Sequence, residues 1–88
     1  MIGELYAEMD NLDEAQKSFL QAVVLAEQIK SRPDLASIYH NLAGVYKRKG
    51  KINQARKYFR QAQEIYVSTD PGEYENIKKE LLSLDNHE

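Results

Sequence analysis

The sequence predicts an all-α fold, a helical repeat of about five antiparallel helices. Three observations lead to this prediction. Apolar residues recur every three to four positions along most of the chain, which is the spacing of one helix face. Turn-forming residues, namely Pro33, Gly50 and the pair Pro71-Gly72, separate the periodic segments. The third observation is an internal repeat, and together the three favour stacked helical hairpins over a sheet.

The repeat appears when the chain is shifted by 40 residues against itself. Neighbouring positions also match in kind, as with Leu12 and Ile52 or Leu25 and Ile65. The superposed identities are Tyr6 on Tyr46, Ala15 on Ala55, Lys17 on Lys57, Phe19 on Phe59, Gln21 on Gln61, and Ala22 on Ala62. A fixed period of this length is typical of solenoid proteins.

The first segment, residues 1–9, reads as the tail of a helix, because Ile2, Leu5, Tyr6 and Met9 share one helical face. By the register of the second copy, about seven residues of that helix are missing upstream. We therefore expect the chain to be a fragment of a longer array or a trimmed one. A turn is expected at Asp10 and Asn11, since short polar side chains accept the free N–H groups of a following helix.

The remaining helices are predicted over residues 12–30, 33–49, 52–68 and 71–84. Pro33 suits a first helical turn, and Gly50 suits the left-handed residue that follows a helix. Asp70 is expected to cap the last helix, with Pro71 at its first position. The chain thus forms a single domain, residues 1–88. It is divided into a truncated first repeat (1–30), a complete repeat (33–68) and a C-terminal capping helix (71–84), about two and a half repeats.

The complete repeat resembles the tetratricopeptide repeat (TPR), whose pattern is W-x2-L-G-x2-Y followed by A-x3-F. The matching residues are Tyr39, Leu42, Ala43, Tyr46, Ala55, Phe59 and Ala62. Tyrosine and alanine replace the Trp and Gly of the pattern, and the period of 40 residues is similar to the longer repeats of kinesin light chains. The resemblance covers residues 2–67 well and 71–84 loosely.

The resemblance implies a protein–protein interaction scaffold that binds a partner peptide or helix on its concave face. The concave positions carried over from the family are Ser37, His40, Asn41, Gly44, Lys47 and Arg48, with Glu4, Ala7 and Glu8 in the truncated repeat. The amide of Asn41 can both donate to and accept from a peptide backbone. Solvated surface positions are the alternative for Asn41 and for His40.

An acidic partner is one expectation, because Lys47 and Arg48 belong to a basic cluster. Residues 47–60 hold seven Lys or Arg and no acid. An ordinary solvated face is the alternative explanation of the cluster. Nucleic acid is disfavoured, because the net charge is −2 and no aromatic residue alternates with the basic ones on an exposed face.

The alternative function is a self-associating structural module, in which chains stack end to end or exchange helices across Ser31–Asp34 to form a homodimer. The acidic segment Asp10–Glu14 and the basic segment Lys47–Lys51 would favour the pairing of unlike ends.

Other classes of function find no support in the sequence. There is no cysteine, His40 and His87 lack acidic neighbours at ligand spacing, and no phosphate loop or nucleophile motif is present. We therefore expect no enzyme, no metal and no cofactor. A cytoplasmic location is expected, although the absence of cysteine fits either a reducing or an oxidising compartment. No apolar run approaches the length of a membrane span, and no basic signal segment begins the chain.

Overall fold

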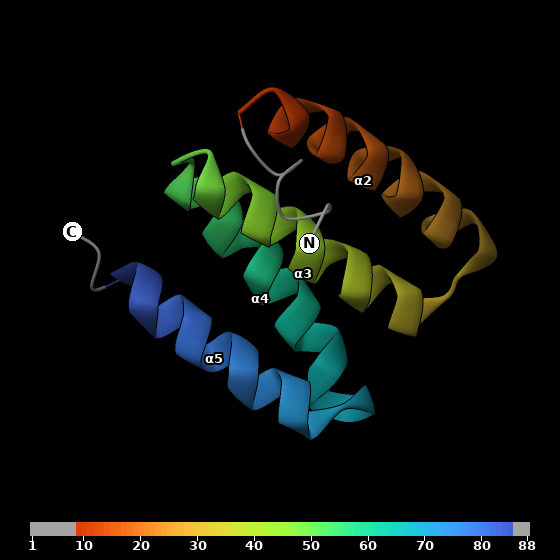
Figure 1. Cartoon of the computed structure of the whole chain (residues 1–88). Coiled ribbons are helices and arrows are strands. Elements are labelled where there is room, and N and C mark those ends of the chain that lie inside the picture. The colour runs from red at the N-terminus through yellow and green to blue at the C-terminus, as the bar shows by residue number, and fades with distance from the viewer. Residues whose placement is uncertain (1–8, 86–88) are drawn as a thin grey trace.

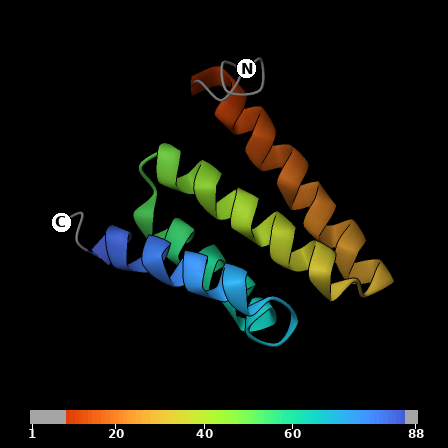
Figure 2. The ribbon, with the colours of Figure 1, turned by 60° about the horizontal axis from the view of Figure 1, so that its bottom comes forward.

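The computed structural model describes residues 9–85, which form four helices: α2 (Met9–Ile29), α3 (Arg32–Arg48), α4 (Ile52–Thr69) and α5 (Pro71–Asp85). Successive helices run antiparallel, and each packs against the next one along the chain (Figures 1 and 2). α3 lies between α2 and α4, and α5 covers the other side of α4 (Figure 1). The all-α repeat architecture is therefore confirmed. The helix expected before Met9 falls outside the described residues.

The turn expected at Asp10 and Asn11 is wrong, because α2 begins at Met9 and includes both residues in its first turn. The physical reason is an ambiguity of residue type. An acidic residue suits an N-cap, but it also suits the first turn, where it interacts favourably with the helix dipole. The pattern alone does not separate these two positions.

Two helices end in the same hydrogen-bonded motif. After α3, Gly50 has φ +80°, its N–H donates to the Lys47 carbonyl (3.0 Å), and the Lys51 N–H donates to the Tyr46 carbonyl (2.9 Å). This is a Schellman motif, and the predicted left-handed role of Gly50 is confirmed. After α2, Lys30 takes the corresponding place with φ 58°, although it carries a side chain. The sequence offered no glycine to mark that end, and α2 stops at Ile29, one residue before its predicted end.

The start of α5 follows the prediction. The N–H of Glu73 donates to Asp70 Oδ1 at 3.3 Å, so the Asp70 side chain caps the helix. The start of α3 lies one residue earlier than predicted, at Arg32. There the Ser31 hydroxyl donates to Asp34 Oδ2 at 2.8 Å instead of capping a backbone N–H.

The core is centred on the α3–α4 hairpin. Small residues at the crossing, Ala43 and Ala55, are fully buried and let the two helices approach closely, while Phe59 fills the space beside them. Tyr58 stacks between Tyr39 and Tyr46, with ring centroids 5.8 and 5.5 Å apart. Most of the residues that identify the repeat therefore have packing roles.

Candidate functional site

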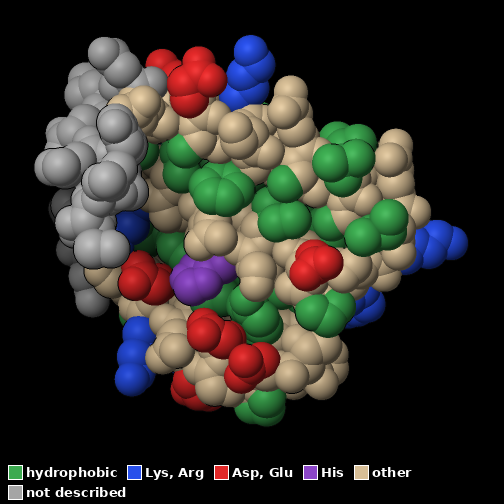
Figure 3. Space-filling model, turned by 45° about the vertical axis from the view of Figure 1, so that its right-hand side comes forward, with side chains coloured by type: hydrophobic (Ala, Val, Ile, Leu, Met, Phe, Trp, Pro, Cys, Tyr) green, Lys and Arg blue, Asp and Glu red, His purple; other side chains and the backbone are tan. Residues whose placement is uncertain are grey.

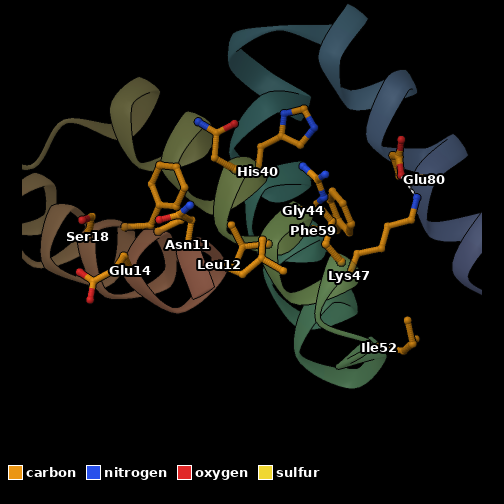
Figure 4. A pocket seen from close by; sticks show the side chains of 15 residues that line it. Asn11, Leu12, Glu14, Ser18, His40, Gly44, Lys47, Ile52, Phe59 and Glu80 are labelled. Carbon is orange, nitrogen blue, oxygen red and sulfur yellow. Dashed lines mark hydrogen bonds and ion pairs between the residues drawn. The ribbon is translucent and has the colours of Figure 1, made fainter. Parts of the chain in front are cut away.

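A groove of about 840 Å³ opens on the face formed by α2 and α3 (Figure 4). Its walls come from these two helices, with α4 and α5 contributing at the base and one edge. The lining residues are Asn11, Leu12, Glu14, Ala15, Ser18 and Phe19 from α2; His40, Asn41, Gly44, Val45, Lys47 and Arg48 from α3; Ile52 and Phe59 from α4; and Glu80 from α5. We call this set the groove.

Five of the six predicted concave residues line the groove. His40, Asn41, Gly44, Lys47 and Arg48 recur at the spacing of one face of α3, so the helix itself brings them together. The His40 ring lies 5.8 Å from the Phe59 ring, centroid to centroid. At Gly44 an added Cβ would meet no atom within 4 Å, so this position leaves open space. Their role in binding stays a prediction.

The sixth predicted residue, Ser37, does not line the groove. Its hydroxyl lies 3.4 Å from the Tyr66 hydroxyl on α4, within hydrogen-bonding distance. Ser37 sits nearer the N-terminus of α3 than the groove extends. The structure therefore separates it from the other five.

The charges of the groove balance one another. Lys47 Nζ lies 3.0 Å from Glu80 Oε1, and both side chains are partly exposed (Figure 4). Glu14 supplies a second acid, and Arg48 a second base. Arg48 makes no ion pair within the part of the chain that the structure describes. The groove thus carries two charges of each sign, whereas the sequence suggested a basic surface.

A second ion pair joins α2 to the end of α3. Lys49 Nζ lies 2.6 Å from Asp13 Oδ1 and donates to Gln16 Oε1, also at 2.6 Å. The hydrogen bond from Lys49, together with its charge, lowers the pKa of Asp13. The acidic and basic segments that the sequence assigned to contacts between chains therefore meet within one chain. That part of the end-to-end hypothesis needs correction, because Asp13 already has a partner.

Of the two tyrosines of α3, Tyr39 makes a hydrogen bond to α2. The Tyr39 hydroxyl donates to Glu27 Oε2 at 3.4 Å, and burial, followed by the charge of Glu27, raises the pKa of Tyr39. Burial also raises the pKa of Tyr46. Neither tyrosine lines the groove, and both have packing roles.

Sequence reasoning missed the contributions of α2 and α5 to the groove. Asn11, Glu14 and Ser18 share one face of α2 at spacings of three and four residues, and this periodicity was the available signal. Nothing in the local sequence of α5 marks Glu80 as a groove residue. It reaches Lys47 only because α5 packs on α4 and brings the two side chains together.

None of the helices described within residues 9–85 is both long and apolar enough to cross a bilayer. No group of three or more His, Asp or Glu side chains within the same residues is placed to hold a metal ion.

Antiparallel hairpins stacked around a lined groove define a helical-repeat scaffold. The sequence profile of the tetratricopeptide repeat family matches residues 1–66, and the chain belongs to this family. Tetratricopeptide repeats are protein–protein interaction modules, and the family points to a repeat scaffold without catalysis.

Three similar proteins illustrate the range of the family. Protein KINESIN LIGHT CHAIN-RELATED 1 of Arabidopsis thaliana is 33% identical over 73 residues, covering 81% of this chain and 12% of that protein. KINESIN LIGHT CHAIN-RELATED 3 of the same plant is 32% identical over 69 residues, covering 76% and 11%. Response regulator aspartate phosphatase E of Bacillus subtilis is 41% identical over 59 residues, covering 67% and 16%. The chain spans a small part of each. No solved structure gave a significant match.

Proposed function

We propose that this chain binds a segment of a partner protein in the groove, by contact alone and without chemistry. The observation that carries the proposal is the groove itself, which has an apolar base and a polar rim contributed by two facing helices. Apolar pockets with a few convergent polar groups are the usual form of a binding site. A cytoplasmic location stays a prediction.

The groove suits a peptide that carries one apolar anchor. Phe19 and Ile52, which line the groove and are only partly buried, provide the apolar surface for such a side chain. Asn41 on α3 and Asn11 on α2 supply amide groups that can donate to and accept from a peptide backbone. Backbone recognition of this kind positions a peptide, while the anchor contributes most of the affinity.

An acidic side chain in the partner is the finer part of the proposal. Arg48 is exposed and has no partner within residues 9–85, so it is available to a carboxylate. Lys47 is already paired with Glu80, and an acidic ligand has to displace Glu80 to reach it. We therefore assign the carboxylate contact first to Arg48 and only second to Lys47.

A peptide array of tiled protein segments, probed with the purified chain, tests this proposal. We expect Asn41→Ala and Lys47→Glu each to weaken the signal at least several-fold, and Arg48→Ala to weaken acidic segments selectively. Ser37→Ala is the matched control, since Ser37 lies on the same helix outside the groove. Circular dichroism checks that each variant folds. Binding that survives both Asn41→Ala and Lys47→Glu in folded proteins excludes the groove.

A second candidate is self-association, because α2 exposes three large apolar side chains, Val24, Leu25 and Ile29. Single exposed apolar residues are ordinary, but neighbouring ones on one helix favour a contact. End-to-end stacking is the weaker form of this candidate. It requires α5 of one copy to cover α2 of the next, and α5 presents the exposed charged side chains of Glu75 and Lys78 on its outer face.

A further inference from the structure

Gly44 occupies a position where the helix itself favours another residue. It lies in the interior of α3, where glycine is the least favourable residue apart from proline, because it loses the most conformational freedom. Among the described glycines only Gly50 has a positive φ. A Cβ added at Gly44 would meet no atom of the described residues within 4 Å. Neither the backbone conformation nor the packing therefore requires a glycine at this position.

The other copies of the repeat have a side chain at the same position. A shift of 39 residues superposes α5 on α3, with Leu81 on Leu42 and Ser83 on Gly44. In the first repeat, 40 residues earlier, the corresponding residue is Glu4. The repeat pattern therefore permits a side chain here. The glycine is peculiar to α3, one of the two helices that form the groove.

Four polar residues surround Gly44 on the surface of α3. His40 and Asn41 lie one turn before it, and Lys47 and Arg48 lie one turn after it, at the spacings that make side chains on a helix neighbours. All four line the groove, as Gly44 does (Figure 4). Because Gly44 has no side chain, the floor between the four is the backbone of α3. We call this gap at Gly44, bounded by these four residues, the α3 notch.

The α3 notch suits the main chain of an extended segment. Close approach of a ligand to the protein backbone is one of the reasons for which glycine is used. An extended segment has backbone N–H and C=O groups that can pair with the Asn41 amide, whereas a helix uses these groups internally. Arg48, on the other side of Gly44, is placed for an acidic side chain of the same segment.

An amphipathic helix fits this part of the groove less well, because such a ligand needs a continuous apolar groove. Val45, the apolar side chain that α3 contributes to the lining, is only 7% exposed. On the face of the molecule shown in Figure 3, hydrophobic side chains reach the surface in separate groups, with acidic and other polar groups between them. The α3 side of the groove therefore offers little apolar surface to a helix.

We propose that Gly44 determines the specificity of the groove: the main chain of an extended partner segment crosses α3 in the α3 notch, and a side chain at Gly44 would hold it away. This inference rests on the peptide binding proposed above, and it adds the conformation of the ligand and the place where it contacts α3. At this position stability is lower than an alanine would give, which is a common trade-off at binding sites.

Paired measurements of stability and binding on Gly44→Ala and Gly44→Leu test the proposal. The midpoint of thermal unfolding, followed by circular dichroism, should be about 4–8 °C higher in Gly44→Ala than in the wild type, because alanine is the better helix former. The binding probe is a fluorescein-labelled synthetic peptide with the sequence of the strongest signal in the peptide array. By fluorescence anisotropy, we expect the dissociation constant to rise at least about threefold in Gly44→Ala and at least about tenfold in Gly44→Leu.

Ser83→Ala and Ser83→Leu are the matched controls. Ser83 has the register position of Gly44 on α5, is exposed and does not line the groove. Alanine and leucine are better helix formers than serine, so both variants should fold. Both should bind the peptide like the wild type, because neither side chain enters the α3 notch.

Methylation of the probe peptide tests the main-chain contact from the side of the ligand. Each backbone nitrogen is methylated in turn, which removes one N–H and adds bulk. We expect the affinity for the wild type to fall at least about tenfold at one or two adjacent positions, those that cross the α3 notch. The loss at these positions should be smaller in Gly44→Leu, where the main chain is already held away. A loss at every interior position indicates a helical ligand and contradicts the proposal.

The ways in which the proposal can fail are distinguishable. A wild type that binds no peptide in the array rejects the proposed function, and this inference with it. Binding that Asn41→Ala weakens, but that neither variant of Gly44 changes, keeps the groove and rejects the role of Gly44. A Gly44→Ala protein that is less stable than the wild type shows that the chain itself fills the space at Gly44, and this result also overturns the proposal.

Discussion

Helices α2 and α4 carry nearly the same pattern of large and small residues, yet they play different parts in the structure. α4 lies between α3 and α5 and has five buried side chains: Ala55, Phe59, Ala62, Ile65 and Tyr66. Within the described residues α2 packs mainly on α3, and just Leu12 and Ala26 are buried. The repeat pattern therefore specifies which face of a helix can be buried. The neighbouring helices determine whether that face is buried.

The largest expected effect is at the phenylalanine that each of the two helices carries at the same position of the repeat. Phe59 is 2% exposed, so Phe59→Ala should lower the free energy of unfolding by about 3–5 kcal/mol, through lost transfer energy and a cavity. Phe19 is half-buried, and Phe19→Ala should cost less than half as much. Urea denaturation monitored by circular dichroism measures both. Equal losses would mean that α2 is covered as fully as α4.

The next pair is Ile65 and Leu25, which occupy the same register position. Ile65→Ala should cost about 2–4 kcal/mol, since the side chain belongs to the core. Leu25→Ala should change stability by less than about 0.5 kcal/mol at a concentration too low for dimers, because surface changes have small effects. A loss at Leu25 that grows with protein concentration instead indicates self-association through the exposed side chains of α2.

Substitutions at the Schellman ends of α3 and α2 should change stability by smaller amounts, and the two changes should have opposite signs. Gly50→Ala should destabilise the fold by about 1–2 kcal/mol, because the left-handed conformation is strained for a residue with a side chain. Lys30→Gly should stabilise by up to about 1 kcal/mol, since it removes that strain and the glycine costs some entropy. Thermal unfolding of the two variants checks the signs. Shifts in the same direction would refute this explanation.

The smallest effect concerns Asp13, whose counterpart in α4 is the neutral Asn53. Lys49 depresses the pKa of Asp13 below its ordinary value of 3.8. The ion pair therefore stabilises the fold above that value, and the contribution disappears as the pH falls through 3.8 toward the lowered pKa. Asp13→Asn should flatten this part of the stability–pH profile. An unchanged profile would show that the pair contributes nothing measurable at this exposed site.

Much of the fold could be predicted from local pattern. The helical periods, Gly50 after α3 and the cap at Asp70 all depend on residues within one turn of each other, and each was confirmed. The left-handed Lys30 could not be predicted, because a lysine stands where this conformation favours glycine. The start of α2 at Met9 was not predicted either, because an acidic residue suits both an N-cap and the first helical turn.

The groove was predicted in part. A single helix face brings His40, Asn41 and Lys47 together, so helical spacing was sufficient for α3. Ser37 was included by the same spacing but turns toward Tyr66. Glu80 was beyond prediction, since its contact with Lys47 joins residues 33 positions apart and depends on the angle at which α5 packs.

By itself the sequence determined an all-α repeat of the TPR family, its helices, and the apolar face of each one. These properties follow from short-range periodicity and from the close packing that small residues such as Ala43 and Ala55 permit. Only the tertiary structure decided that the groove is balanced in charge, that Asp13 pairs within the chain, and that Glu80 of α5 reaches Lys47 of α3. Each of these depends on which distant side chains meet, and that is set by how helices pack.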